Sequence, residues 1–66
     1  MEFKDRLKEL RVASNLSQMQ LANRLGVSQS AIAKWELGKT EPTASAIILV
    51  AKFFSESTDY VLGVVD

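Results

Sequence analysis

Four side chains between residues 29 and 34 could act together, because helical spacing would place them on one face. They are Gln29, Ser30, Ala33 and Lys34. The second pair follows the first by four residues, a distance at which side chains are neighbours on a helix surface. The face offers an amide, a hydroxyl, a methyl group and a cation, and none of these is an activated nucleophile. The chemistry that this spacing supports is recognition by hydrogen bonding and contact.

Side chains of these types match the base edges in the major groove of double-stranded DNA. Glutamine can bind adenine through two hydrogen bonds, serine can pair with a donor or an acceptor, and alanine can touch the thymine methyl group. Lys34 could reach a guanine edge or a phosphate. A polar helix face without any partner would have the same composition, so these residues by themselves leave both interpretations open.

The composition argues against an enzyme or a metalloprotein. The 66 residues include no cysteine and no histidine, which removes the thiolate ligand, the commonest metal ligand and the most frequent general base. The remaining candidates are carboxylates, lysines, serines and Tyr60, and no two of them converge on a pocket by their spacing. We therefore predict no catalytic residue, no metal site and no cofactor.

The elements that must position the four side chains are helices, because helical periodicity recurs and strand-like alternation is absent. Phe3, Leu7 and Leu10 follow an i, i+4, i+7 pattern and predict an amphipathic helix over roughly residues 2–14. Later helices are expected to begin at residues that cap helices well, namely Ser17, Ser28, Thr43 and Ser57 or Thr58. We predict an all-α fold, a compact five-helix bundle that forms one domain over residues 1–66.

The second and third helices, over about residues 17–37, fit the geometry of a helix-turn-helix. Two helices that cross closely need a small residue at their contact, and Ala22 supplies it. Gly26 suits the short connection where the chain reverses. Ile32 and Trp35 share the inward face of the third helix and are expected to anchor it, so we assign Trp35 to the core.

The fourth predicted helix, with the sequence AIILVAKFF, is apolar almost all round. A small monomer can cover one apolar stripe of a helix but not most of its circumference. Two explanations stay open at this point. The helix could be central, with the others wrapped around it. Alternatively, part of its surface could be buried in a dimer together with Tyr60, Val61, Leu62, Val64 and Val65.

The stretch LSQMQLANRLGVSQSAIAKWELGKTEP resembles the helix-turn-helix of the phage repressor-like family of bacterial and phage transcription regulators, the lambda and 434 repressor type, also called XRE-like. The pattern S-Q-x-x-L-A, the L-G-V-S turn, W-E-x-G and the following proline occur together. The similarity continues into RLKELRVASNLSQ before this stretch and FFSESTDYVLG after it. The resemblance implies a DNA-binding domain that covers nearly the whole chain.

The resemblance implies a role for each matching residue. The base-reading residues would be Gln29, Ser30, Ala33 and Lys34. The phosphate-contacting residues would be Gln18, Ser28, Lys39, Thr40 and Arg11. The residues that support the site would be Ala22, Gly26, Ile32, Trp35 and Glu36. In some family members a paired arginine and glutamate tie the first helix to the third, and Arg11 and Glu36 match this pair.

Charge and departures from the family pattern suggest weak binding by one copy. Residues 1–39 hold seven basic and four acidic side chains, a net charge of +3, and residues 40–66 hold one and four, a net charge of −3. Glu41 stands where some relatives have a basic residue, and Thr43 offers no arginine to the minor groove. Few phosphate contacts give low affinity at physiological salt. We therefore expect a homodimer, formed through helices four and five, on half-sites about 34 Å apart.

The leading hypothesis is a cytoplasmic, sequence-specific repressor that binds a palindromic DNA operator. No apolar run approaches the roughly 18 residues that suggest a membrane-spanning helix, so no membrane partner is expected. The alternative is an antitoxin or another protein-interaction module, which the apolar fourth helix and the acidic C-terminal half would suit. A protein partner and DNA binding can also coexist in one molecule.

Overall fold

Five α-helices and no strand make up the fold, which confirms the all-α prediction. The computed structural model describes all 66 residues. The helices are α1 (Phe3–Ala13), α2 (Gln18–Leu25), α3 (Gln29–Leu37), α4 (Ala44–Phe54) and α5 (Thr58–Leu62). No helix is long and apolar enough to cross a membrane.

The starts of four helices follow directly from their capping residues. The hydroxyls of Ser17, Ser28, Thr43 and Ser57 each accept a hydrogen bond from the backbone N–H three residues later. At α2 the Gln20 side chain also accepts from the Ser17 N–H, which completes the predicted capping box. Ser57, not Thr58, caps α5. The short connections between helices follow from these local signals.

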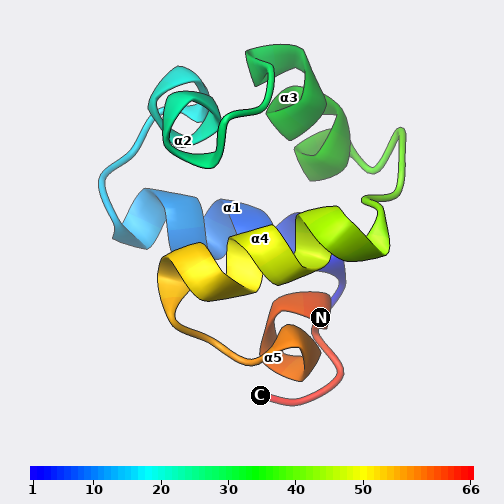
Figure 1. The fold of residues 1–66 in the computed structure, drawn as a ribbon. Coiled ribbons are helices and arrows are strands. Elements are labelled where there is room, and N and C mark those ends of the chain that lie inside the picture. The colour runs from blue at the N-terminus through cyan, green and yellow to red at the C-terminus, as the bar shows by residue number, and fades with distance from the viewer.

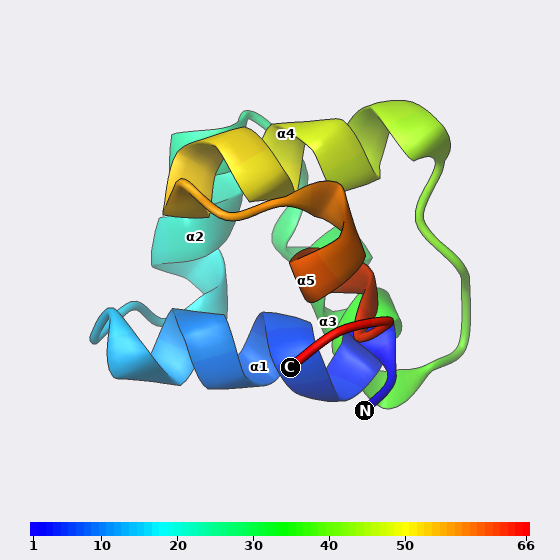
Figure 2. The same cartoon turned by 90° about the horizontal axis from the view of Figure 1, so that it is seen from below.

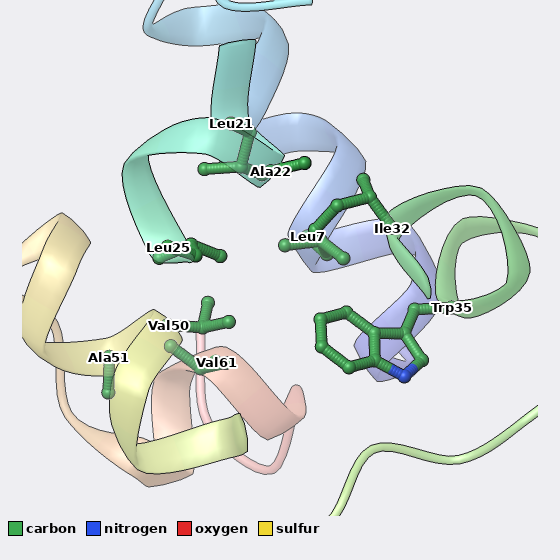
Figure 3. Close-up of a cluster of buried hydrophobic side chains, with 9 residues drawn as sticks. All are labelled: Leu7, Leu21, Ala22, Leu25, Ile32, Trp35, Val50, Ala51 and Val61. Atoms are coloured by element: carbon green, nitrogen blue, oxygen red, sulfur yellow. The ribbon is translucent and has the colours of Figure 1, made fainter. Parts of the chain in front are cut away.

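The core takes one fully buried aliphatic side chain from every helix. These side chains are Leu7, Leu21, Ile32, Val50 and Val61, and Figure 3 shows them converging with Ala22, Leu25, Trp35 and Ala51. Burying such a side chain contributes roughly 1.5–3 kcal/mol. A chain without disulfides depends on this single cluster, so all five helices must be in place to complete it.

Two helices that run in the same direction bound the core on opposite sides. Figure 1 superimposes α1 and α4, and the perpendicular view in Figure 2 separates them, with α2 and α5 bridging the space between. The α2–α3 pair packs on α1 mainly through α3, while α4 packs on α5 and α2. The α2–α3 pair at one end of the molecule is therefore supported by α1.

The hypothesis that the fourth helix is central, with the others wrapped around it, is wrong. Only Val50 and Ala51 of α4 are buried, while Ile48 and Leu49 are 47% and 38% exposed. The reason is that α3, which packs on both α1 and α2, is at the centre of the contacts between helices, while α4 packs on α5 and α2. Val61, which the dimer hypothesis also included, is fully buried within the single chain and is not available to a partner.

The two ends of the chain meet beside α1. Gly63 has a φ of +78°, and a Cβ atom at this position would overlap the Met1 carbonyl oxygen. The Arg6 guanidinium lies 3.8 Å from the centre of the Tyr60 ring and donates to the Val65 carbonyl oxygen. Sequence analysis did not single out Arg6, which is almost fully buried and holds the segment after α5 against α1.

Candidate nucleic-acid interface

The predicted helix-turn-helix is formed by α2 and α3, which pack closely on each other. Ala22 is buried at their contact, in the position where a small residue was expected. Gly26 ends α2 with a φ of +73°, a conformation that residues with a Cβ rarely adopt. Together they set the direction in which α3 leaves the turn.

Ile32 and Trp35 anchor α3 to the body of the protein, as predicted. Ile32 is fully buried, and Trp35 packs edge-to-face on Phe3 with ring centres 6.3 Å apart. Trp35 is thus part of the core, not an exposed ring on which a base could stack. These two contacts hold the opposite face of α3 outward.

The outward face of α3 carries the four predicted base-reading residues. Ser30 and Lys34 are exposed, and Gln29 and Ala33 are half-buried. Leu37, at the end of the same face, is among the most exposed large apolar side chains of the protein. The face therefore presents amide, hydroxyl, methyl and ammonium groups with no bulky side chain between them.

An ion pair between Arg11 and Glu36 ties α1 to the end of α3. Arg11 Nε lies 2.7 Å from Glu36 Oε2, and Arg11 Nη2 lies 3.0 Å from Glu36 Oε1. A third N–H, on Nη1, donates to the Leu16 carbonyl oxygen at 2.8 Å. The Glu36 side chain is only 5% exposed, so its carboxylate depends on these donors. The predicted pairing is therefore present, and it is bidentate.

The hydrogen bonds to Glu36 raise the pKa of Arg11 above its ordinary value, and the negative charge of the carboxylate adds to this shift while burial opposes it. A raised pKa favours the charged guanidinium in the folded protein. On the alkaline side, the contribution of the charged guanidinium to stability would be lost only as the pH rises above the ordinary pKa of arginine. The Arg11 guanidinium is consequently charged at physiological pH.

Gln18 extends this ion pair into a chain of hydrogen bonds that sequence analysis missed. Gln18 Nε2 donates to Glu36 Oε1 at 3.2 Å, and Gln29 Nε2 donates to Gln18 Oε1 at 2.8 Å. The direction is dictated from one end, because a carboxylate can only accept. Gln18 must turn its NH₂ group to Glu36 and its oxygen to Gln29, and Gln29 must donate in turn. No spacing in the sequence reveals this, because Gln18 and Gln29 lie on different helices.

The predicted phosphate contacts lie around the starts of α2 and α3 and after the end of α3. Gln18 is half-buried at the first residue of α2, and Ser28 is exposed at the N-cap of α3. Lys39 and Thr40 are exposed beyond Gly38, which ends α3 with a φ of +74°. The backbone N–H of Lys39 donates back to Lys34 within the turn, so this loop has a fixed start.

The phosphate contact that the resemblance implies for Arg11 competes with the ion pair. Three of the five guanidinium N–H groups already donate within the protein, and the side chain is 13% exposed. The role that the structure assigns to Arg11 is support of Glu36. A phosphate contact through its remaining N–H groups stays a prediction.

Comparison with known proteins finds relatives over nearly the whole chain. A helix-turn-helix family model matches residues 7–61. The chain is 47% identical over 63 residues to the HTH-type transcriptional activator BcrR of Enterococcus faecalis, a match that covers 96% of this chain and 31% of that protein. It is 43% identical over 52 residues to the HTH-type transcriptional regulator MJ0272 of Methanocaldococcus jannaschii, with 79% of each chain covered. The chain thus spans about a third of BcrR and about half of several other relatives.

The fold is similar to that of the P22 c2 repressor protein, whose crystal structure was determined in complex with a synthetic operator. The TM-score is 0.86 at 31% sequence identity, and the match covers 94% of each chain. Five short helices in the same arrangement account for this similarity. Since the family model spans α2, α3 and most of the residues that support them, the chain belongs to the helix-turn-helix family of phage repressor-like proteins.

Proposed function

We propose that the protein binds double-stranded DNA sequence-specifically and regulates transcription, as a repressor that occupies its operator. The relatives named as transcription regulators and the likeness to a repressor–operator complex support this function. The observation that carries it is the orientation of the Gln29 amide at the start of α3. The residues in α3 would lie in the major groove, where the N-terminal part of a recognition helix meets base edges.

The hydrogen bond to Gln18 orients the Gln29 amide so that it could bind adenine. One N–H of its amide is used by Gln18, which leaves the oxygen and the second N–H free. Adenine presents the N6 amino group as a donor and N7 as an acceptor in the major groove. The free oxygen of Gln29 would accept from N6, and the free N–H would donate to N7. Ser30 and Lys34, both exposed, would read neighbouring base pairs, and Ala33 would contact a methyl group.

Contacts to the DNA backbone would fix the register of α3. Gln18 keeps one amide N–H, and the N-terminus of α2 adds its positive dipole end, so both favour a phosphate at this point. Ser28, Lys39 and Thr40 would bind phosphates on either side of the groove. Lys34 on α3 and Lys39 just after it are exposed cations, and so few of them predict a modest dependence of affinity on salt.

We propose further that the protein binds as a homodimer through α4 and α5. Ile48 and Leu49 on α4 and Val64 and Val65 after α5 make up a set of exposed apolar side chains. Exposed apolar groups that gather on one side mark interaction surfaces. A symmetric pair would present two copies of α3 to a palindromic operator.

The same apolar set supports a second candidate function, binding of a different protein, as an antitoxin binds its toxin. The C-terminal half also has a net charge of −3, which would suit a basic partner. Copurification from the source cell followed by mass measurement of the intact complex separates the two possibilities. A stable complex with a second protein favours this function, and a mass of two identical chains favours the homodimer.

Selection of bound duplexes from a random DNA library tests the proposed function. We expect an enriched half-site repeated with inverted symmetry. Gln29→Ala should relax the preference at one base pair of each half-site by about 1–3 kcal/mol, whereas Lys39→Ala, at a proposed phosphate contact, should weaken all sequences alike. Lys8→Met, on the exposed surface of α1, is the control that should bind as the unchanged protein does. Absence of any sequence preference at low salt would contradict the proposal.

A further inference from the structure

An open cavity of about 190 Å³ lies where the start of α1 meets the end of α3 and the loop that follows it. Its walls include Glu2, Phe3, Lys4, Trp35, Thr40 and Glu41. Only Thr40 among them belongs to the proposed DNA contacts. The cavity therefore has a chemistry of its own, which the recognition of DNA does not explain.

The indole N–H of Trp35 opens into this cavity without a partner in the protein. Trp35 is 9% exposed, and Nε1–H is the only hydrogen-bonding group of its side chain. The protein's own donors and acceptors leave this group unpaired, and it is not sealed in the interior. Figure 3 shows the nitrogen on the ring edge that faces away from the core cluster, toward the chain after α3. A polar group in this position is suited to an acceptor atom of a ligand.

The charged groups around the cavity are of both signs. Lys4 lies along Gly38, with its Cδ 3.1 Å from the place where a Cβ of residue 38 would be, and its Nζ is 3.8 Å from a carboxylate oxygen of Glu2. This long contact is exposed to solvent and is weak. Glu41 has no cationic partner closer than 4 Å. The cavity thus combines one cation and one free donor with two carboxylates, one of which is unpaired.

We propose that this cavity binds a small α-amino acid. The carboxylate of the amino acid accepts hydrogen bonds from Trp35 Nε1–H and Lys4 Nζ, and its ammonium group pairs with Glu41. A dry cavity of about 150 Å³ holds benzene, so a volume of about 190 Å³ suits an amino acid with a short side chain, packed on Phe3. A DNA phosphate suits the site less well, because two carboxylates face it and only one cation does.

Occupation of this cavity bears on the DNA interface through the loop after α3. Thr40 and Glu41 would contact the ligand from the same loop in which Lys39 and Thr40 would contact phosphates. Any change that the amino acid causes in operator affinity must be matched by an equal change that the operator causes in amino-acid affinity. The ligand site itself does not require that the protein bind DNA.

Nuclear magnetic resonance of the ¹⁵N-labelled protein without DNA tests the proposal. Trp35 is the only tryptophan, so the spectrum contains one indole N–H resonance and reports directly on the cavity. Titration with each common amino acid in turn should shift this resonance saturably for one or a few small ones. Lys4→Met and Glu41→Gln should each weaken this binding about tenfold, which corresponds to roughly 1.4 kcal/mol. Lys8→Met and Glu56→Gln, which change exposed charges outside the cavity, should leave it unchanged.

Three outcomes would overturn the proposal. The first is an indole resonance that no amino acid moves. The second is equal binding of the N-acetyl amide of the same amino acid, which lacks both charges, or equal binding by the Lys4 and Glu41 variants. The third is a resonance that moves only with a DNA duplex or inorganic phosphate, which would assign the cavity to a backbone contact instead.

Discussion

At the residue scale, the group that would read DNA is controlled by groups that never touch a base. The Gln29 amide is oriented by Gln18, Gln18 by Glu36, and Glu36 by Arg11. Each link is dictated by the one before it, because a guanidinium only donates and a carboxylate only accepts. The buried Glu36 carboxylate stands in the middle of this series of hydrogen bonds and fixes their direction. Loss of its partner would leave a buried charge unpaired.

Removal of one partner of the Arg11–Glu36 ion pair should lower the free energy of unfolding more than removal of both partners. Arg11→Met would leave the buried Glu36 carboxylate uncompensated and should lower the free energy of unfolding by about 3–5 kcal/mol. Arg11→Met combined with Glu36→Leu should recover much of this loss, because two apolar side chains of similar size replace the pair. Urea unfolding of the two variants measures the difference. Equal instability of both would show that the pair acts mainly through packing.

At the element scale, capping residues and residues in the left-handed conformation determine where each helix begins and ends. The predicted first helix, over residues 2–14, and the observed α1, Phe3–Ala13, differ by one residue at each end. Asn15 takes a φ of +58° beyond α1, as expected from its tolerance of this conformation. Gly63, in contrast, serves two purposes, since it ends α5 and also allows the N-terminal residues to approach.

Substitutions can distinguish Gly26, which only ends α2, from Gly63, which ends α5 and also lies against the Met1 carbonyl group. A Cβ at residue 26 would meet no atom within 4 Å, so Gly26→Ala should cost only the backbone strain, about 1–2 kcal/mol. Gly63→Ala should cost more, because its Cβ also displaces the Met1 carbonyl. Asparagine tolerates the left-handed conformation, so Gly26→Asn should be nearly neutral and Gly63→Asn should not. Thermal unfolding of the four variants gives the comparison, and equal losses at the two sites would refute it.

At the scale of the whole molecule, dimensions and charge both favour binding in pairs. The longest extent of the chain is 27 Å, less than the roughly 34 Å between half-sites one helical turn apart. One copy is therefore too short to span two such half-sites. The excess positive charge expected for residues 1–39 is also less available than the count suggests, because Arg6 and Arg11 are buried against Glu9 and Glu36. Two copies would double the few free cations that remain.

A charge placed among the exposed apolar side chains of α4 tests the proposed dimer. Ile48→Lys should convert dimers to monomers, because an unpaired charge in a buried apolar contact is costly. Binding to an isolated half-site should be unchanged, while affinity for the full operator should fall at least tenfold, or about 1.4 kcal/mol. Sedimentation and operator titration measure the two effects. Val12→Lys, at a similarly exposed apolar residue on α1, is the control, and an Ile48 variant that remains dimeric would exclude this surface.

The sequence by itself determined the features whose causes lie within a few residues of each other. The five helices, their caps at Ser17 and Ser28, the turn at Gly26 and the inward stripe with Ile32 were all predictable, because capping and helical periodicity act over three or four positions. The Arg11–Glu36 pair was predictable only through the resemblance to a family. None of these predictions needed the packing of one helix against another.

The tertiary structure decided everything that depends on how the helices cross. Gln18 meets Gln29 across the contact of α2 and α3, Val61 is buried, and α4 lies on the flank with an exposed apolar face. The unpaired indole N–H of Trp35 likewise depends on where the loop after α3 passes. Periodicity specifies which face of a helix is apolar, but crossing geometry determines how much of that face is covered and which polar groups come within hydrogen-bonding distance.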